Sequence, residues 1–251
     1  SDLNSFKGNY LNVRLVNSAI TCIKNENNFI PLLNSSDKLL CISIGNSDRI
    51  AFQDAIDLHL NCEHINVPKY FSQDIFIEVL NKVKLYDIIL ININNTNSFA
   101  NYNYGITNNA IVLCDSIANI KPSILSLFAT PYILKVFKNL DKFKTILISY
   151  QDNPLIQEAT AQTILGNNKS NGVLPVSINN NYPYGTSIST NEGDRVGDAF
   201  PEYFNISSDK FANIDSLIVN AIEDELFTSA SIGVIYKNKM IGFSYFILYF
   251  G

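Results

Sequence analysis

The chain has 251 residues, of which 47% are hydrophobic and 16% charged, with a formal net charge of −5. This composition supplies enough apolar side chains for a buried core and excludes an intrinsically disordered chain. An acidic chain lacks the basic surface that holds a phosphate backbone, and the longest apolar stretch, residues 241–250, is too short to cross a bilayer. We therefore expect neither a nucleic-acid partner nor a membrane span.

Apolar runs alternate with amphipathic stretches from about residue 38 to residue 178. The pattern predicts strands at residues 39–44, 63–67, 86–93, 124–129, 145–150 and 174–178, and helices at residues 48–60, 73–83, 107–118 and 154–165. The run at residues 86–93 has Ile and Leu on both faces, which is typical of a strand in a parallel sheet covered on both sides. The alternation predicts an α/β fold, with a doubly wound, mostly parallel sheet and helices on both faces.

The composition changes after this series. Residues 179–205 are rich in Asn, Gly, Ser and Pro, which is typical of a linker or a long surface excursion. Residues 207–225 predict an amphipathic helix with Ser207 or Ser208 as its N-cap. Residues 231–236 and 240–249 flank turn residues and predict a β-hairpin, so the chain closes with a partial α+β segment. A lone hairpin is marginally stable in water, so we expect its aromatic tail to pack on a partner or to be poorly ordered.

The cysteines and histidines do not predict a metal or redox site. No two of the four cysteines stand at Cys-x-x-Cys spacing, so we expect all of them to be small buried hydrophobic residues: Cys22, Cys41, Cys62 and Cys114. His59 and His64 flank Cys62, but this grouping is a poor match to a zinc site and we expect no metal there.

Ligands of a doubly wound sheet bind at the carboxyl ends of its strands. The polar residues that follow the predicted strands are therefore the candidates for substrate binding: Asn46, Asp48, Arg49, Asn95, Tyr132 and Asp152. They can line a sugar-binding wall. Asp48 and Asp152 also precede predicted helices, where a carboxylate favours the positive end of the helix dipole, so both are equally explained as helix caps.

The sequence assigns no catalytic residue and no cofactor. The loop after the first strand has one glycine and matches neither G-x-G-x-x-G nor a P-loop, which argues against a nucleotide cofactor. Hydrolysis of a glycosidic bond needs two carboxyl groups that flank it, and no convincing pair stands out. Glu158 lies in the middle of a predicted helix and is interpreted as structural.

Four stretches resemble the second domain of the family 3 glycoside hydrolases, the β-glucosidases and β-N-acetylglucosaminidases. Residues 18–32 resemble the family's S-I-T-L-L-K-N…L-P-L opening, and Thr130-Pro131-Tyr132 resembles its N-P-Y turn, with Ala129 and Thr130 in place of the usual Gly and Asn. Residues 150–159 resemble Y-x-D-N…Q-E-A, and residues 172–176 resemble the G-K-L-P-V strand. Together these stretches cover roughly residues 1–180.

The remainder is similar to the linker and opening of a class C β-lactamase-like serine hydrolase domain. This weaker likeness rests on Tyr184-Gly185-Thr186, Gly197, Pro201-Glu202, the helix at residues 208–221 and the hairpin at residues 232–245. The two resemblances imply a glycosidase second domain at residues 1–180, a linker at residues 181–206, and the start of a β-lactamase-like domain at residues 207–251.

The resemblance implies a parent enzyme of the retaining β-N-acetylglucosaminidase type, acting on glycans or peptidoglycan fragments. Its nucleophilic Asp and proton-shuttling His would lie in a preceding (β/α)8 barrel, and the Ser-x-x-Lys of the lactamase-like domain would lie beyond residue 251. No catalytic residue is therefore carried over to this chain, which would brace the barrel and supply loops to the sugar cleft. The resemblance also implies a periplasmic or secreted location in a bacterium.

Two other hypotheses remain open. One is a non-enzymatic binding module of flavodoxin-like architecture, with a small polar ligand such as a sugar over the strand ends. The other is a serine esterase or amidase with its activity in the carboxyl-terminal portion.

Overall fold

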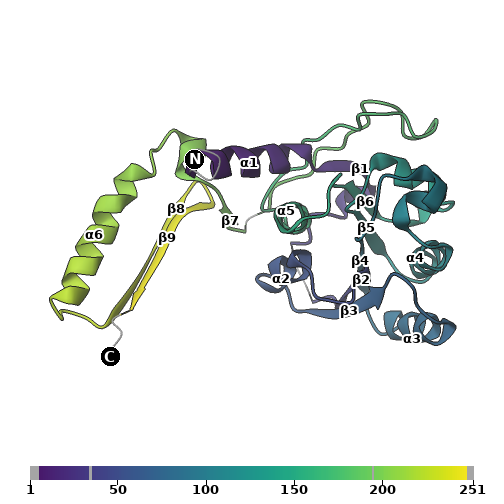
Figure 1. The fold of residues 1–251 in the computed structure, drawn as a ribbon, viewed down its shortest axis with the longest axis horizontal. Coiled ribbons are helices and arrows are strands. Elements are labelled where there is room, and N and C mark those ends of the chain that lie inside the picture. Colours follow the sequence, from purple (N-terminus) through teal and green to yellow (C-terminus); the bar gives the residue numbers. More distant parts are fainter. Residues whose placement is uncertain (1–5, 34–35, 194, 248–251) are drawn as a thin grey trace. The chain divides into compact units, whose positions relative to one another are not determined.

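The computed structural model describes residues 6–33, 36–193 and 195–247 (Figure 1). The chain forms two compact units: the larger comprises residues 12–193, and the smaller contains the described residues up to 11 and from 195 onward. The predicted limits of a domain, a linker and a second domain stay a prediction. None of the helices in the described ranges is long and apolar enough to span a bilayer.

The larger unit is built on a six-stranded sheet with the order β1-β6-β5-β4-β2-β3. Its strands are β1 (Thr21–Asn25), β2 (Leu39–Gly45), β3 (Cys62–Pro68), β4 (Ile88–Ile93), β5 (Ser123–Leu127) and β6 (Thr145–Ile148). Neighbouring strands from β2 to β6 pair in parallel, and β1 joins the edge antiparallel to β6. The predicted mostly parallel α/β sheet is therefore confirmed.

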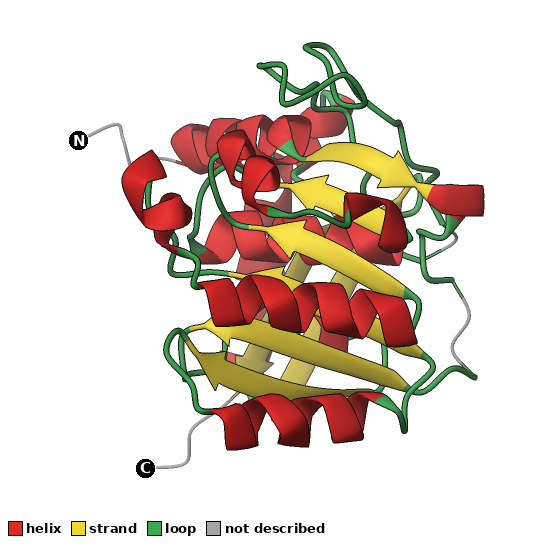
Figure 2. Cartoon of the chain, turned by 90° about the vertical axis from the view of Figure 1, so that its right-hand side faces the viewer, coloured by secondary structure: helices red, strands yellow, loops and turns green. Residues whose placement is uncertain are grey.

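Helices cover both faces of this sheet (Figure 2). They are α2 (Ala51–Asp57), α3 (Gln73–Val83), α4 (Asn108–Ile120) and α5 (Pro154–Leu165). The helix α1 (Phe6–Ala19) precedes β1, and its Val16 belongs to the core on the α2–α5 side. Short 3₁₀ segments connect them at η2 (Glu26–Asn28), η3 (Ala100–Gly105), η4 (Pro131–Val136) and η5 (Leu140–Lys142). Side-chain oxygens of Ser72, Thr107 and Asn153 accept hydrogen bonds from the first turns of α3, α4 and α5, which is why these helices begin where they do.

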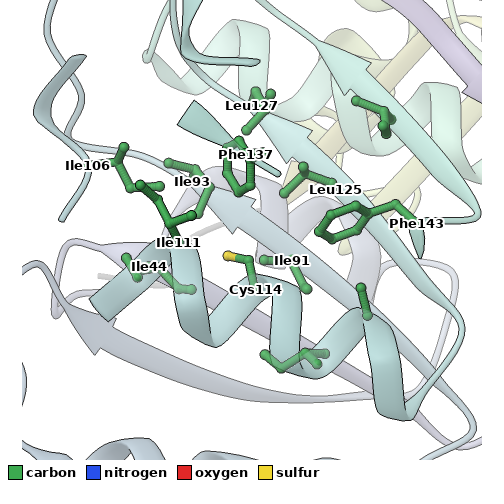
Figure 3. Close-up of a cluster of buried hydrophobic side chains, with 14 of the residues drawn as sticks. Ile44, Ile91, Ile93, Ile106, Ile111, Cys114, Leu125, Leu127, Phe137 and Phe143 are labelled. Atoms are coloured by element: carbon green, nitrogen blue, oxygen red, sulfur yellow. The ribbon is translucent and has the colours of Figure 1, made fainter. Parts of the chain in front are cut away.

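Each strand contributes to two separate cores. On β4, Ile89, Ile91 and Ile93 face the α3–α4 side of the sheet, whereas Ile88 and Leu90 face the α2–α5 side. Figure 3 shows Ile91 and Ile93 among side chains from α4 and the neighbouring strands. Burying an aliphatic side chain of this size contributes about 1.5–3 kcal/mol, so the central strands hold most of the stabilising apolar surface.

All four cysteines are buried and free, as predicted. Burial raises the pKa of the Cys22 and Cys62 thiols to about 12. A buried thiol with a raised pKa behaves as a small hydrophobic group.

The predicted strand at residues 174–178 is wrong. Its backbone pairs with the segment that follows: Leu174 N donates to Thr186 O at 2.9 Å, and Ile178 N donates to Tyr182 O at 2.9 Å. Pro175 has no N–H to donate to a sheet. The edge position is instead held by β1, which the periodicity did not predict.

The smaller unit contains the predicted helix and hairpin. They are α6 (Asp209–Glu223), β8 (Ser229–Tyr236) and β9 (Lys239–Ile247), with the short β7 (Gly197–Asp198) parallel to β9 and η6 (Pro201–Phe204) after it. Lys237 and Asn238 both have positive φ, the backbone that a two-residue hairpin turn of type I′ requires. The side chains of the aromatic tail at residues 243–250 lie outside the described residues.

Ser207, rather than Ser208, contacts the start of α6. The Ser207 hydroxyl accepts a hydrogen bond from Asp209 N at 3.3 Å. Ser208 has helical torsion angles and makes no side-chain cap bond.

Gly45, the last residue of β2, is a position at which only glycine fits. Its φ is +139°, and a Cβ atom there would lie 2.2 Å from the backbone oxygen of Asn94. We expect Gly45→Ala to lower the free energy of unfolding by at least about 2 kcal/mol, because it adds a clash to an unfavourable backbone conformation. Urea unfolding monitored by circular dichroism measures this loss.

Gly185 provides the matched control. Its φ is +85°, but nothing lies within 4 Å of a Cβ atom placed there. Gly185→Ala should therefore lower the free energy of unfolding only through its unfavourable backbone conformation, by about 1 kcal/mol. Equal losses in the two variants would contradict the close contact at Gly45.

Candidate functional site

The topological switch point of the sheet lies between the carboxyl ends of β2 and β4. The chain runs from β2 outward to β3, and then returns to place β4 on the other side of β2. Ligands of doubly wound sheets usually bind in the crevice at such a point. Asn46 and Asn95, two of the predicted site residues, flank it.

In this protein the ends of β2 and β4 are linked by hydrogen bonds. Asn46 N donates to Asn94 Oδ1 at 2.7 Å, and Asn94 N donates to Ile44 O at 3.0 Å. The Asn94 side chain is buried against Gly45, whose missing Cβ makes this approach possible. The ends of β2 and β4 are therefore in direct contact through Gly45, Asn46 and Asn94.

The Asp152 carboxylate accepts two hydrogen bonds at the same edge of the sheet. One carboxylate oxygen accepts from Asn95 N at 2.7 Å, and the other accepts from Gln157 Nε2 at 2.7 Å. These bonds join the loop after β4 to the first turns of α5. The helix-cap interpretation of Asp152 is wrong, because Asn153 occupies the cap position and its side chain accepts from Ile156 N.

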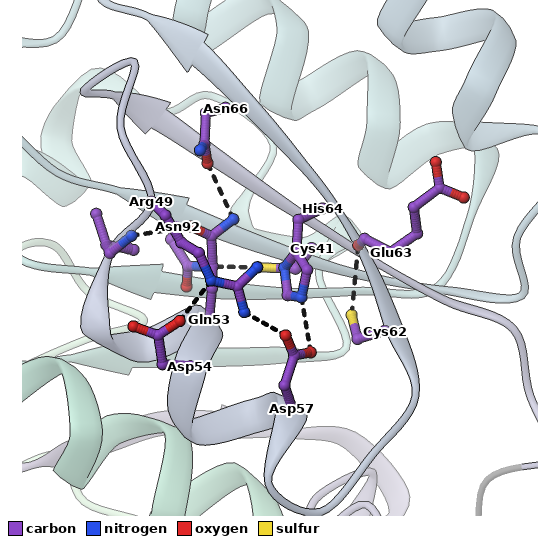
Figure 4. Close-up of polar contacts among 11 residues, drawn as sticks. Cys41, Arg49, Gln53, Asp54, Asp57, Cys62, Glu63, His64, Asn66 and Asn92 are labelled. Atoms are coloured by element: carbon purple, nitrogen blue, oxygen red, sulfur yellow. Dashed lines mark hydrogen bonds and ion pairs between the residues drawn. The ribbon is translucent and has the colours of Figure 1, made fainter.

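Arg49 and Asp48 do not join this group. Arg49 forms ion pairs with Asp54 and Asp57 on α2 (Figure 4). Asp48 is exposed and does not cap α2, since the cap position is Ile50 and its N–H donates to the Gln53 side chain at 3.0 Å. The capping interpretation of Asp48 is therefore also wrong.

The Arg49 ion pairs belong to a small network that links α2 and β3 (Figure 4). His64 Nε2 lies 2.7 Å from Asp57 Oδ1, so this carboxylate contacts both Arg49 and His64. Partial burial alone would raise the pKa of Asp57, but the hydrogen bonds from His64 and Arg49 outweigh it and leave the pKa below its ordinary value. These contacts link the loop before α2, α2 itself and β3 through Asp57.

Tyr132, the last predicted candidate, lies at the start of η4 in an aromatic pair. Its ring stacks on Tyr104 with centroids 6.5 Å apart, and Lys135 Nζ lies 5.1 Å from its ring centroid. Thr96 Oγ1 also donates to Phe128 O at 2.9 Å. The loops after β4 and β5 are thus held together by a stacked ring pair and a hydrogen bond.

A pocket of about 320 Å³ opens beside these loops, between the end of β3 and the long loop after β4. It is lined by Lys69, Tyr70, Asn97, Tyr102, Asn103, Gly105, Ile106, Thr107 and Asn108. None of the predicted candidates lines this pocket. Whether those residues bind a substrate stays a prediction. The sequence signal for the pocket was the Lys69-Tyr70 pair directly after β3 and the tyrosine- and asparagine-rich stretch at residues 97–108.

The described ranges do not offer a metal centre at this edge. Within them, no three His, Cys, Asp or Glu side chains gather as metal ligands would. His64 bonds to Asp57, and His59 Nε2 lies 3.3 Å from Asn167 Nδ2. No carboxylate occurs among the residues that line the pocket.

Comparison with solved structures shows where this fold occurs. A β-glucosidase from Erythrobacter marinus is 14% identical over 74% of this chain and 36% of its own length, with a TM-score of 0.57. A family 3 β-N-acetylglucosaminidase from Paenibacillus sp. is 15% identical over 70% of this chain and 34% of its own, with a TM-score of 0.56. The chain therefore has a fold found within family 3 glycosidases, and it spans about a third of their length.

A third structure extends over more of the chain. A fungal multi-domain family 3 β-N-acetylglucosaminidase, described as having a GCN5-related glucosamine N-acetyltransferase region, is 15% identical over 95% of this chain and 28% of its own, with a TM-score of 0.55. No protein-family model and no curated protein sequence matches the chain. At these identities the likeness establishes the fold alone.

The lowered pKa of Asp57 makes a pH-dependent contribution to stability. A carboxyl group with a depressed native pKa stabilises the fold above its unfolded pKa of about 3.9, and this stabilisation is lost as the pH falls through the native pKa. The Asp57 side chain is 37% exposed, so solvent weakens its ion pairs. We expect Asp57→Asn to lower the free energy of unfolding by about 0.5–1 kcal/mol at pH 7 and by much less near pH 2.5.

Urea unfolding of both proteins from pH 2.5 to pH 7 measures this difference. Asp37→Asn, at an exposed turn position, is the control for simply removing a negative charge. A loss in Asp57→Asn that does not change with pH would contradict an electrostatic role.

Proposed function

We propose that this chain is an accessory domain of a glycoside hydrolase, without a catalytic centre of its own. The parent enzyme would cleave terminal N-acetyl-β-glucosaminides from glycans or peptidoglycan fragments, with its reacting groups in a preceding (β/α)8 barrel. A secreted or periplasmic location in a bacterium belongs to the same proposal. The fold shared with family 3 glycosidases, one of them a β-N-acetylglucosaminidase, supports it.

The observation that carries the proposal is that the polar side chains at the strand ends bond to other parts of this chain. Asn94 and both carboxylate oxygens of Asp152 bond to neighbouring loops, and Arg49 bonds to carboxylates of α2. Glycoside hydrolysis by two carboxyl groups needs them about 5–10 Å apart across the scissile bond. Side chains that hold the loops together suit a domain that presents a rigid edge to a neighbour.

The proposal predicts that this chain alone does not release 4-nitrophenol from 4-nitrophenyl N-acetyl-β-glucosaminide, whereas the longer parent chain does. Asp152→Asn in the parent should leave kcat within about twofold but lower the melting temperature, because the bond to Asn95 N is weakened. Turnover by the purified chain that disappears in Asp152→Asn would show instead that this domain performs the chemistry.

The smaller unit has two candidate roles, each as the opening of a further domain. The resemblance of residues 207–251 favours a β-lactamase-like serine hydrolase. The alignment with the fungal enzyme covers 95% of the chain, more than residues 12–193 can supply, so part of the smaller unit has a counterpart in that protein. The second candidate comes from the description of that protein, which names an N-acetyltransferase region that acts on glucosamine.

Two probes of the parent protein separate these candidates. We expect acetyl-coenzyme A to acetylate glucosamine in its presence, measured by release of the free thiol, and we expect no labelling by a fluorescent penicillin or a fluorophosphonate. Deletion of residues 207–251 and everything after them is the control, since it should abolish acetylation and spare glycosidase activity. Labelling without acetyl transfer would favour the serine hydrolase.

A further inference from the structure

We propose that the pocket between the end of β3 and the loop after β4 binds one acidic sugar residue, a pyranose that carries a carboxylate. The inference rests on the carbohydrate role proposed above and names a ligand class and a site that the strand-end candidates do not include. Three properties of the pocket support it: its size and preformed walls, its aromatic and amide lining, and its charge.

The pocket has the size of one sugar ring and is formed without a ligand. Its volume of about 320 Å³ is at the lower end of the range for small-molecule sites. Thr107 Oγ1 donates to Lys69 O at 3.4 Å, Asn97 N donates to Tyr104 O at 2.8 Å, and Asn103 Nδ2 donates to Asn108 Oδ1 at 3.3 Å. The first bond joins the two walls and the other two hold the loop at residues 97–108 in shape, so little ordering is needed when a ligand binds.

Two tyrosine rings stand exposed at the pocket. Tyr70 is 81% exposed and Tyr102 is 74% exposed, so both rings are accessible to a ligand in the pocket. A pyranose has an apolar C–H face that packs on such rings and a rim of hydroxyl groups. The side-chain amides of Asn97, Asn103 and Asn108 offer both donors and acceptors to those hydroxyls.

The positive charge of Lys69 in the pocket favours an acidic ligand. Lys69 Nζ donates to Asn95 O at 3.1 Å, which uses one of its three protons. It also lies 3.2 Å from the point that a Cβ atom on Gly105 would occupy, so the amine is held above the glycine. Among the residues that line the pocket no carboxylate offsets this charge. A carboxylate on the sugar would receive a charge-assisted hydrogen bond, which is stronger than one to a neutral group.

The test is an NMR titration of this chain with methyl β-D-glucuronide and methyl β-D-glucoside, which share a ring and differ in the carboxylate. We expect shifts in the amide signals of residues 97–108 with both sugars and a dissociation constant on the order of millimolar for the glucuronide. The glucuronide should bind about fivefold more tightly than the glucoside at low salt, and this preference should shrink at ~0.5 M salt.

Substitutions separate the roles of the lining residues. Lys69→Met should remove the preference for the glucuronide but keep glucoside binding, whereas Tyr102→Ala should weaken both by a similar factor. Lys135→Met, which removes a cation beside Tyr132 instead of one in the pocket, is the matched control and should change neither. Circular dichroism confirms that each variant is folded.

Either of two results overturns the inference: no shift at residues 97–108 with either sugar, or a glucuronide preference that survives Lys69→Met. The proposed function fails separately, because it is tested by hydrolysis in the parent enzyme and this site by binding to the chain alone.

Discussion

The architecture of the larger unit depends on the contact between Gly45 and Asn94. Doubly wound sheets leave an opening where the strand order reverses, and here the backbone of one strand end touches the next because Gly45 has no side chain. Asn94 then bonds to Asn46, and Asn95 is turned toward Asp152. The loops that follow β2 and β4 and the first turn of α5 are thereby linked at the switch point.

The path of the chain after this contact also determines where the pocket lies. The backbone leaves β4 directed toward α5 at Asn95 and has to return to the start of α4 at Asn108. It does so through η3, with positive φ at Asn103 and Tyr104, and this loop arches beside the end of β3. The pocket and the stacked Tyr104–Tyr132 pair are both consequences of this path.

The elements that local chemistry specifies were predictable from the sequence. The helices at residues 73–83 and 154–165 match residue for residue, because Ser72 and Asn153 cap them and the apolar spacing continues to their ends. The strand β1 was missed because five residues with a lysine give no clear period, and its partner β6 is far along the chain. Residues 174–178 are as apolar as a strand, yet their backbone bonds to the next turn.

The candidate site was less predictable than the fold for a related reason. The rule that ligands bind at strand ends located the correct edge, but it could not reveal that Asp152 bonds to a backbone group 57 residues away. Nor could it assign a pocket whose walls are the end of β3 and a folded loop. Such side-chain pairings depend on tertiary distance, which periodicity does not encode.

The buried cysteines have a consequence for the surroundings in which this protein can persist. Burial raises the pKa of the Cys22 and Cys62 thiols to about 12, so the thiolate is far scarcer at pH 7 than in an exposed cysteine. Oxidants attack the thiolate, so Cys22 and Cys62 are almost inert while the fold is intact. The fold of the larger unit therefore protects these two thiols from oxidation.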